Sequence, residues 1–285
     1  MASSTLPARV GVLGGGRMGA GIAHAFLING CDVLVVERDQ GAADAATERI
    51  ARSVKASNER GLLDSPVDEV LERLTLSLEQ QDFSDRELVV EAVPEIWDLK
   101  VSSLKNIESV LPADAVLASN TSSLSIDGLA EQLSSPERFL GLHFFNPVPA
   151  STLIEVVVGK RSDADLVSRA QEWTTALGKT PVVVNDAPGF ASSRLGLAIA
   201  LEAMRMVDEG VASAEDIDNA MVLGYKHPTG PLRTTDIVGL DVRLGIAEYL
   251  ESTLGERFAP PQILRDKVAR GELGRKSGRG FFDWD

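Results

Sequence analysis

The feature that most constrains this fold is a glycine-rich segment, GGGRMG, which joins an apolar run to a helical pattern near the N-terminus. Arg9–Leu13 reads as a buried strand, Met18–Asn29 as a helix and Cys31–Glu37 as a second buried strand. Gly30 lies directly after the helical pattern, where a glycine commonly ends a helix. Strand, helix and strand within about 30 residues form a β-α-β unit, so we expect a parallel sheet that starts with these two strands.

The glycine segment itself fits the pattern G-x-G-x-x-G. Gly14 would allow the tight turn, Gly16 the close approach of a pyrophosphate, and Gly19 the packing of helix against strand. The N-terminus of the following helix offers N–H groups and a partial positive charge to phosphates. Glycine-rich turns are common, but the position after a strand and before a helix favours a dinucleotide site over a purely structural turn.

Glu37 closes the second strand and predicts which dinucleotide binds. A carboxylate at this position can accept hydrogen bonds from the adenosine ribose and would repel a 2′-phosphate, which favours NAD over NADP. Arg17 and Arg38 lie nearby in the sequence and could offset part of a 2′-phosphate charge, so NADP is the alternative cofactor. A solvated charge at a strand end is the other interpretation of Glu37.

Further strand-like runs alternate with helical patterns through the first two thirds of the chain. This alternation predicts an α/β fold of the Rossmann type, with a mostly parallel sheet covered on both faces. Ala42–Arg60 reads as a long helix with small and sparse apolar residues, which we expect to project from the body. The further strands are predicted at Leu74–Leu78, Leu88–Ala92, Ala115–Ser119, Phe139–Phe144, Ile154–Val158 and Pro181–Val184.

The pattern changes at Asp186–Gly189, where proline and glycine together end a strand and turn the chain. Beyond this point the sequence has helical patterns and almost no strands. We therefore expect an NAD-binding domain over residues 1–185 and a smaller all-helical domain over 186–285, which serves substrate binding and dimerisation. Its helices are predicted at Arg194–Asp208, Glu215–Leu223, Leu240–Leu254 and Ile263–Arg270.

Composition excludes several classes of partner. The net charge of −14 argues against nucleic acid, and an anionic ligand would need helix N-termini or placed Lys and Arg residues to hold it. No apolar run approaches the roughly 20 residues that cross a bilayer, and the N-terminus lacks a signal pattern. One cysteine, Cys31, allows no intrachain disulfide. We expect a cytoplasmic protein without a membrane partner and without a metal site.

One of the three histidines has the placement of a catalytic residue. His143 ends a strand-like run and is followed by Asn146 and Pro147, and the carboxyl ends of strands face the ligand crevice in open α/β sheets. Imidazole can take and return a proton near neutral pH. His24 lies in the first predicted helix and His227 in a turn, where packing and structural roles are the better interpretations.

Longer segments resemble the L-3-hydroxyacyl-CoA dehydrogenase family, and within it the short single-function 3-hydroxybutyryl-CoA dehydrogenases. The resemblance covers nearly the whole chain and is far more specific than the glycine pattern. It is carried by ASNTSSL at 118–124, GLHFFNPVP at 141–149, LIE at 153–155, DAPGF at 186–190 and GRKSGRGF at 274–281.

The resemblance implies a role for each matching position. His143 would be the base when the hydroxyl is oxidised and the acid when the ketone is reduced, and Glu155 would fix its tautomer and stabilise the imidazolium. Ser122 would hydrogen-bond the reacting oxygen, and Asn146 would help to place nicotinamide and substrate. The other cofactor positions are Met18, Ala92, Glu95, Lys100, Asn120 and Lys276.

The resemblance also predicts an acyl-CoA substrate and a homodimer formed through the helical domain. Arg52 and Lys55 are the candidates for the coenzyme A phosphates. Ser193 stands where the family usually has an asparagine that contacts substrate, and Ala150–Thr152 replaces a bulkier stretch, so both bear on acyl-chain preference.

Four simpler interpretations stay open at this point. Ser122 and Ser123 could cap a helix, and Glu155 could be an exposed strand residue. The chain could act on free hydroxy acids or sugar acids, or it could bind NAD without catalysis.

Overall fold

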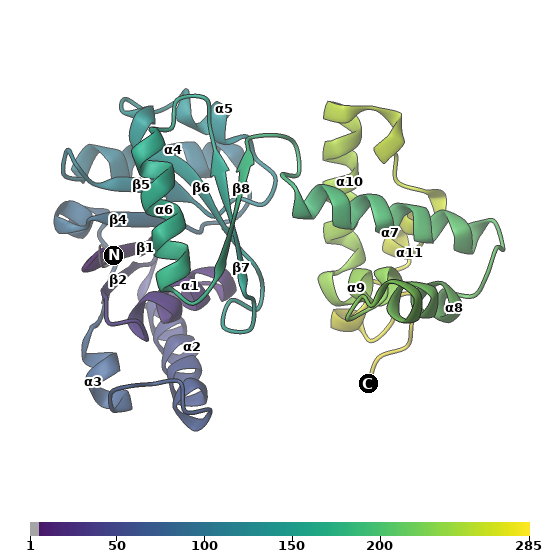
Figure 1. The fold of residues 1–285 in the computed structure, drawn as a ribbon, viewed down its shortest axis with the longest axis horizontal. Coiled ribbons are helices and arrows are strands. Elements are labelled where there is room, and N and C mark those ends of the chain that lie inside the picture. Colours follow the sequence, from purple (N-terminus) through teal and green to yellow (C-terminus); the bar gives the residue numbers. More distant parts are fainter. Residues whose placement is uncertain (1–5) are drawn as a thin grey trace. The chain divides into compact units, whose positions relative to one another are not determined.

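The computed structural model describes residues 6–285 and divides the chain into two compact units (Figure 1). The first unit ends at Ala187 and the second runs from Pro188 to Asp285. This division lies two residues after the boundary expected from the proline and glycine at 188 and 189.

The first unit contains an eight-stranded sheet within the described residues, in the order β3-β2-β1-β4-β5-β6-β7-β8. Six strands from β3 to β6 are parallel, β7 runs antiparallel to β6, and β8 runs parallel to β7. The mostly parallel sheet is confirmed, and each predicted strand lies within one residue of its observed bounds. The strands are β1 (Arg9–Leu13), β2 (Asp32–Val36), β3 (Leu74–Ser77), β4 (Leu88–Glu91), β5 (Val116–Ser119), β6 (Phe139–Phe144), β7 (Leu153–Val158) and β8 (Thr180–Asn185).

Helices cover the two faces of this sheet because the strand order reverses between β1 and β4. Right-handed crossovers that move in opposite directions along a sheet place their helices on opposite faces. Helix α1 (Arg17–Leu27) and α6 (Ala164–Ala176) share one buried core with the sheet. Helix α4 (Trp97–Val110) and α5 (Ile126–Ala130) lie on the other face (Figure 1). The reversal point is where open α/β sheets bind ligands, outside the carboxyl ends of the strands.

Helix α2 (Gln40–Glu59) packs against α1, and the expectation that it projects from the body is wrong. A narrow stripe of small and branched side chains with helical spacing is buried along its whole length. Ala and Ser contribute little hydrophobicity to a sequence pattern, which is why the stripe is easily missed. Its buried residues are Ala43, Ala46, Ile50, Val54 and Ser57. A short helix, α3 (Val67–Glu72), follows and also contacts α2.

The second unit is helical, as expected, but it contains a helix that the sequence pattern did not predict. Helix α9 (Pro231–Val238) begins at a proline after Gly230, in a segment that reads as a turn. Proline suits the first turn of a helix because its missing N–H would have no intrahelical acceptor there. The other helices are α7 (Ser192–Asp208), α8 (Ala214–Asn219) with a following π-helical turn over Ala220–Gly224, α10 (Leu240–Leu254) and α11 (Gln262–Ala269).

A buried carboxylate holds the C-terminal segment onto this helical unit. Asp236 of α9 accepts hydrogen bonds from the backbone N–H groups of Phe281 and Phe282 and from the Trp284 indole. The segment thereby covers the core formed around Leu197, Leu201 and Met204, among other residues. Across residues 6–285, none of the helices combines the length and apolar character of a membrane span.

His24 in α1 predicts a pH dependence of folding stability. The ring is buried, its Nε2 lies 2.8 Å from Ser57 Oγ, and burial together with the charge of Lys179 lowers its pKa from 6.5 to about 4. Between these pH values the unfolded chain binds a proton that the folded chain does not. Stability is therefore lost as the pH falls through this window, by roughly 3 kcal/mol from this group.

Urea unfolding across this pH window tests the expectation. A double variant, His24→Leu with Ser57→Ala, removes both polar partners and should flatten the pH dependence of the free energy of unfolding. Equal slopes in the wild type and the double variant would show that His24 does not cause the effect.

Candidate active site

The glycine turn between β1 and α1 leaves room beside the N-terminus of the helix. Gly14 has a φ of 91°, a conformation that favours glycine. A methyl group added at Gly19 would overlap the Gly14 carbonyl oxygen, whereas one added at Gly16 would meet no protein atom within 4 Å. Gly16 is the N-cap residue of α1, so no side chain caps this end of the helix. The open side of the turn and its uncapped N–H groups fit a dinucleotide pyrophosphate.

Glu37 lies against this turn. Its Oε1 accepts a 2.6 Å hydrogen bond from the Gly15 N–H, so the carboxylate is fixed at the edge where an adenosine ribose would lie. Arg49 of α2, which the sequence pattern did not single out, donates from Nη1 to the Gly15 carbonyl at 3.3 Å. Arg38 pairs with Asp39 at 3.0 Å, which partly offsets the charge that could have favoured a 2′-phosphate.

Three other predicted cofactor residues lie near the carboxyl ends of the central strands. Met18 is in the first turn of α1, and Ala92 directly follows β4 and donates its N–H to the Leu13 carbonyl. Asn120 follows β5, and its Oδ1 accepts the Phe144 N–H at 2.8 Å. Asn120 therefore ties the end of β6 to the loop after β5.

His143 and Glu155 are paired across neighbouring antiparallel strands. The register of β6 and β7 places the two residues directly opposite each other, and Nδ1 lies 2.8 Å from Glu155 Oε2. Both side chains are almost fully buried, at 8% and 1% exposure. A carboxylate only accepts hydrogen bonds, so Nδ1 is the donor and Nε2 carries the lone pair of the neutral ring. The pair can therefore take up a proton at Nε2 with a carboxylate to stabilise the imidazolium.

Ser122 lies in a loop that Glu95 organises. Glu95 Oε1 accepts from the N–H groups of Ser122 and Ser123 at 2.8 and 3.0 Å, from Thr121 Oγ1 at 2.5 Å and from Ser123 Oγ at 3.0 Å. Ser122 Oγ itself lies 3.3 Å from the same oxygen. The cap of α5 is Ser125, so the interpretation of Ser122 and Ser123 as helix caps is wrong.

Opposing effects act on the Glu95 carboxyl. Burial favours its neutral form, but the charge of Lys100 and the hydrogen bonds from the loop outweigh burial, so the pKa lies below its usual value. Glu95 is therefore ionised at neutral pH and accepts from the whole loop at once.

Lys100 lies behind the site rather than on its surface. Its side chain is 1% exposed, and its Nζ lies 2.7 Å from Glu91 Oε1, 3.2 Å from the Val93 carbonyl and 3.3 Å from Glu95 Oε2. An ammonium has three donors, and these three acceptors engage all of them. A direct contact with a cofactor, as the resemblance implied, would require these bonds to exchange. Glu91 was missed, although a carboxylate at the end of the buried run LVVE is a visible signal.

The remaining predicted residues lie outside the contacts described so far, some in the first unit and some in the helical unit. Arg52 and Lys55 are exposed and three residues apart on α2, hence on neighbouring positions of one helix face. Asn146 is exposed in the loop after β6. In the helical unit, Ser193 lies in the first turn of α7, and Lys276 pairs with both Asp241 oxygens at 2.6 Å.

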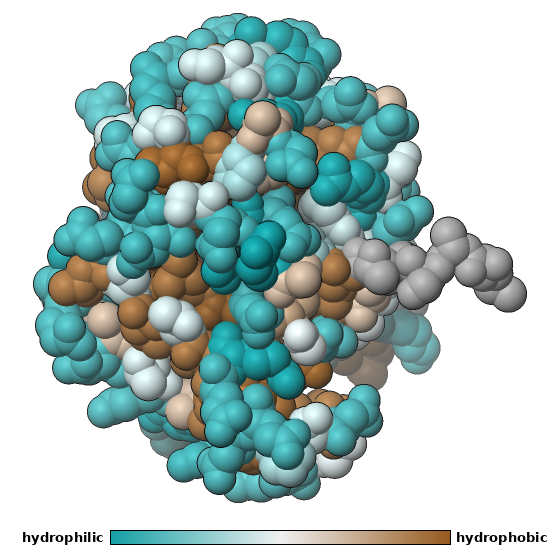
Figure 2. All heavy atoms as spheres, turned by 90° about the vertical axis from the view of Figure 1, so that its left-hand side faces the viewer, coloured by the Kyte–Doolittle hydropathy of each residue, from teal (hydrophilic) through white to brown (hydrophobic). Residues whose placement is uncertain are grey.

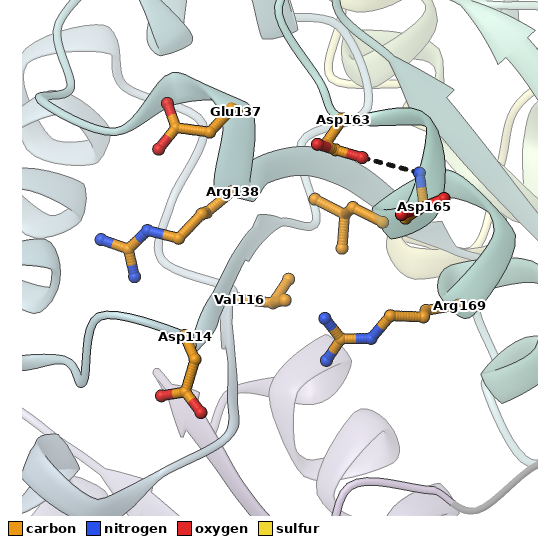
Figure 3. Close-up of a pocket in the computed structure, with 8 residues that line it drawn as sticks. Asp114, Val116, Glu137, Arg138, Asp163, Asp165 and Arg169 are labelled. Carbon is orange, nitrogen blue, oxygen red and sulfur yellow. Dashed lines mark hydrogen bonds between the residues drawn. The ribbon is translucent and has the colours of Figure 1, made fainter.

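A cavity of about 210 Å³ lies away from these residues (Figure 3). It opens at the amino ends of β5 and β6 and at the start of α6, the opposite edge of the sheet from His143. Arg138 donates to the Pro112 and Ala115 carbonyls, and Asp163 caps α6. Arg138 and Asp163 therefore have structural partners. The cavity also lies at the amino ends of the strands, whereas a cofactor would bind at their carboxyl ends. Its lining is mostly charged and comprises Asp114, Val116, Glu137, Arg138, Asp163, Asp165, Leu166 and Arg169.

The chain is similar to a family of known enzymes over both units. Residues 9–187 match the NAD binding domain of 3-hydroxyacyl-CoA dehydrogenase, and residues 189–284 match its C-terminal domain. A probable 3-hydroxybutyryl-CoA dehydrogenase from Deinococcus radiodurans is 40% identical, covering 97% of this chain and 100% of the relative. A 3-hydroxybutyryl-CoA dehydrogenase from Mycobacterium tuberculosis is 41% identical, covering 97% and 98%.

The fold is similar to solved structures as well. The crystal structure of (S)-3-hydroxybutyryl-CoA dehydrogenase from Ralstonia eutropha has a TM-score of 0.94 with 36% identity. The similarity covers 98% of this chain and 100% of that one.

Proposed function

We propose, because this chain belongs to the 3-hydroxyacyl-CoA dehydrogenase family, that it interconverts a short 3-hydroxyacyl-CoA and its 3-ketone, with 3-hydroxybutyryl-CoA as the first candidate substrate. The chain is an NAD-dependent oxidoreductase. The observation that carries the proposal is the buried hydrogen bond between His143 and Glu155, at the carboxyl end of β6. The short acyl chain is supported by relatives that act on 3-hydroxybutyryl-CoA.

The residues of the glycine turn fit the dinucleotide. Gly16 and the first N–H groups of α1 would hold its pyrophosphate, and Glu37 would accept from the adenosine ribose, with Gly14 and Gly19 shaping the turn. Bound NAD⁺ supplies the acceptor for the hydride that leaves C3 of the substrate. Glu37 supports NAD rather than NADP, because its carboxylate is already fixed by the Gly15 N–H.

The proton follows a separate route through the chain's own side chains. His143 takes the substrate hydroxyl proton at Nε2, and Glu155 stabilises the imidazolium that forms. In the reverse direction His143 returns the proton to the developing alkoxide. Ser122 donates its one O–H to the same oxygen in exchange for its 3.3 Å contact with Glu95, and Asn146 helps to orient the substrate.

The coenzyme A part of the substrate needs local positive charge, because the net charge of the chain is −14. Arg52 and Lys55 on the exposed face of α2 supply it in this proposal. Ser193 contacts the acyl part in place of the more usual asparagine; a serine is shorter and has no amide donor. Lys276, which pairs with Asp241 in the structure, would contact the cofactor by exchanging that partner.

Initial rates with a panel of ketones test the proposal. Acetoacetyl-CoA, longer 3-ketoacyl-CoA esters, 3-oxoadipyl-CoA and free acetoacetate are each reduced with NADH and with NADPH, and absorbance of the nicotinamide is followed. We expect the highest kcat/KM for acetoacetyl-CoA with NADH. Equal turnover of free acetoacetate would indicate a hydroxy acid dehydrogenase. NADH binding without turnover of any ketone would indicate a non-catalytic protein.

A homodimer in the cytoplasm completes the proposal. The helical unit supports dimerisation, because Leu195 and Ile199 lie one turn apart on α7 and are 64% and 38% exposed. Two apolar side chains on one helix face favour burial against another surface. Sedimentation velocity at micromolar concentration measures the mass, and a monomer would contradict this part.

A further inference from the structure

Glu91 and Lys100 form an ion pair that lies entirely inside the first unit. The side chains are 0% and 1% exposed, and Nζ lies 2.7 Å from Oε1. Removing two charges from water costs about as much as their attraction returns, so such a pair is weak evidence for stability. The contacts around the pair indicate what else it does.

The Glu91 carboxylate joins segments that flank the candidate site. Oε1 also accepts the Val93 N–H at 2.7 Å, which fixes the turn that leads from β4 to Glu95. Oε2 accepts from Ser119 Oγ at 2.6 Å, at the last residue of β5. The loop that carries Ser122 begins directly after Ser119. One carboxylate therefore holds the starting points of both segments that meet at Ser122.

Lys100 extends this connection to Glu95. Its Nζ lies 3.3 Å from Glu95 Oε2, while Glu95 Oε1 accepts from the N–H groups of Ser122 and Ser123. The charged partner of Glu95 is Lys100 of α4, which also pairs with Glu91 of β4. The loop presents only N–H and hydroxyl groups. A single buried cation thus serves two carboxylates.

We propose that Glu91 and Lys100 are positioning residues for the reaction: Glu91 holds the Lys100 ammonium in place, and Lys100 keeps Glu95 ionised, which fixes the backbone of Ser122. An ionised carboxylate is acceptor-only, so the N–H groups of Ser122 and Ser123 and the hydroxyls of Thr121 and Ser123 must point toward it. A protonated Glu95 would donate one hydrogen and accept fewer, and the loop would lose its fixed geometry. The inference rests on the proposed function, because there Ser122 is the residue that contacts the reacting oxygen.

Four variants test the positioning role of Glu91 and Lys100. Lys100→Met removes the cation, Glu91→Gln removes one carboxylate, and the double variant Glu91→Gln/Lys100→Met removes both partners. Lys105→Met, an exposed lysine on the same helix without an ion pair in the described structure, is the matched control. For each variant we would measure kcat and KM for acetoacetyl-CoA with NADH, kcat/KM from neutral pH down to about pH 5, and the Tm of the protein without cofactor.

Lys100→Met should lower kcat by roughly 10²-fold, as expected for a displaced catalytic group, and leave KM for the ester close to its original value. Its kcat/KM should also fall at a higher pH on acidification than that of the wild type, since Glu95 becomes protonated more easily. The double variant should recover Tm, because losing both partners of a buried pair is milder than losing one. Its kcat should stay low, and its kcat/KM should still fall at a higher pH on acidification than that of the wild type. Lys105→Met should match the wild type in every measurement.

A purely structural pair would give a different pattern. The positioning role is wrong if kcat follows Tm through the variants and kcat/KM falls at the same pH in all of them. Turnover by the wild type would in that case still support the proposed function. If the single variants do not fold, the double variant carries the test through its pH profile. A wild type that reduces no 3-ketoacyl-CoA would overturn the proposed function instead.

Discussion

Replacing His143 with asparagine is expected to lower kcat by roughly 10²- to 10⁴-fold, the usual contribution of a positioned acid–base group. Asparagine keeps an amide donor that can still reach Glu155, so the buried carboxylate is not left without a partner. It removes the Nε2 atom that takes and returns the proton. Glu155→Gln should have an effect in the same range, because a neutral amide cannot stabilise the imidazolium.

Stopped-flow or steady-state reduction of acetoacetyl-CoA measures both variants. His227→Asn is the matched control, since this histidine lies in the irregular segment before α9 of the helical unit, and its turnover should equal that of the wild type. The Tm of each variant separates lost chemistry from lost folding. Near-normal turnover by His143→Asn and Glu155→Gln together would remove the pair from the mechanism.

Gly19→Ala should destabilise the first unit and weaken NADH binding at the same time. The added methyl group overlaps the Gly14 carbonyl oxygen, which is backbone and cannot rotate away. Overpacking of this kind costs about 1 to 3 kcal/mol, and the turn must move to accommodate it. Urea unfolding reports the lost stability, and NADH fluorescence reports the cofactor affinity.

Gly16→Ala provides the contrast within the same turn. Its methyl group meets no protein atom within 4 Å, so the free energy of unfolding should change by no more than about 0.5 kcal/mol. NADH affinity should nevertheless fall, because the methyl group enters the space that the pyrophosphate needs. Wild-type affinity in Gly16→Ala would place the cofactor elsewhere.

Local patterns predicted the elements well because hydrophobic periodicity reports burial directly. The strands β1, β2 and β4 to β7 are mostly apolar and almost fully buried, so each one is visible in the sequence, whereas β3 and β8 are only partly buried. Helix α9 was missed because its Pro231 and Gly230 read as turn residues. The packing of α2 was misjudged because alanine and serine mark a close helix contact only weakly.

The site was harder to predict because its contacts cross strands and loops. The resemblance named His143 and Glu155, but only the antiparallel register of β6 and β7 places them opposite each other. The resemblance also placed Lys100 at the cofactor, whereas the structure buries it between Glu91 and Glu95. Which acceptors surround a lysine depends on tertiary packing, and no local pattern in the sequence encodes it.

The claim on which the mechanism depends is that Glu155 holds the proton of neutral His143 on Nδ1, which leaves Nε2 to exchange a proton with the substrate. Nitrogen-15 NMR of the imidazole rings distinguishes the two tautomers, and three histidines keep the spectrum simple. The His143→Asn spectrum assigns the resonance. The account predicts the Nδ1–H tautomer for neutral His143, with the preference lost in Glu155→Gln. A neutral ring that carries its proton on Nε2 would contradict it.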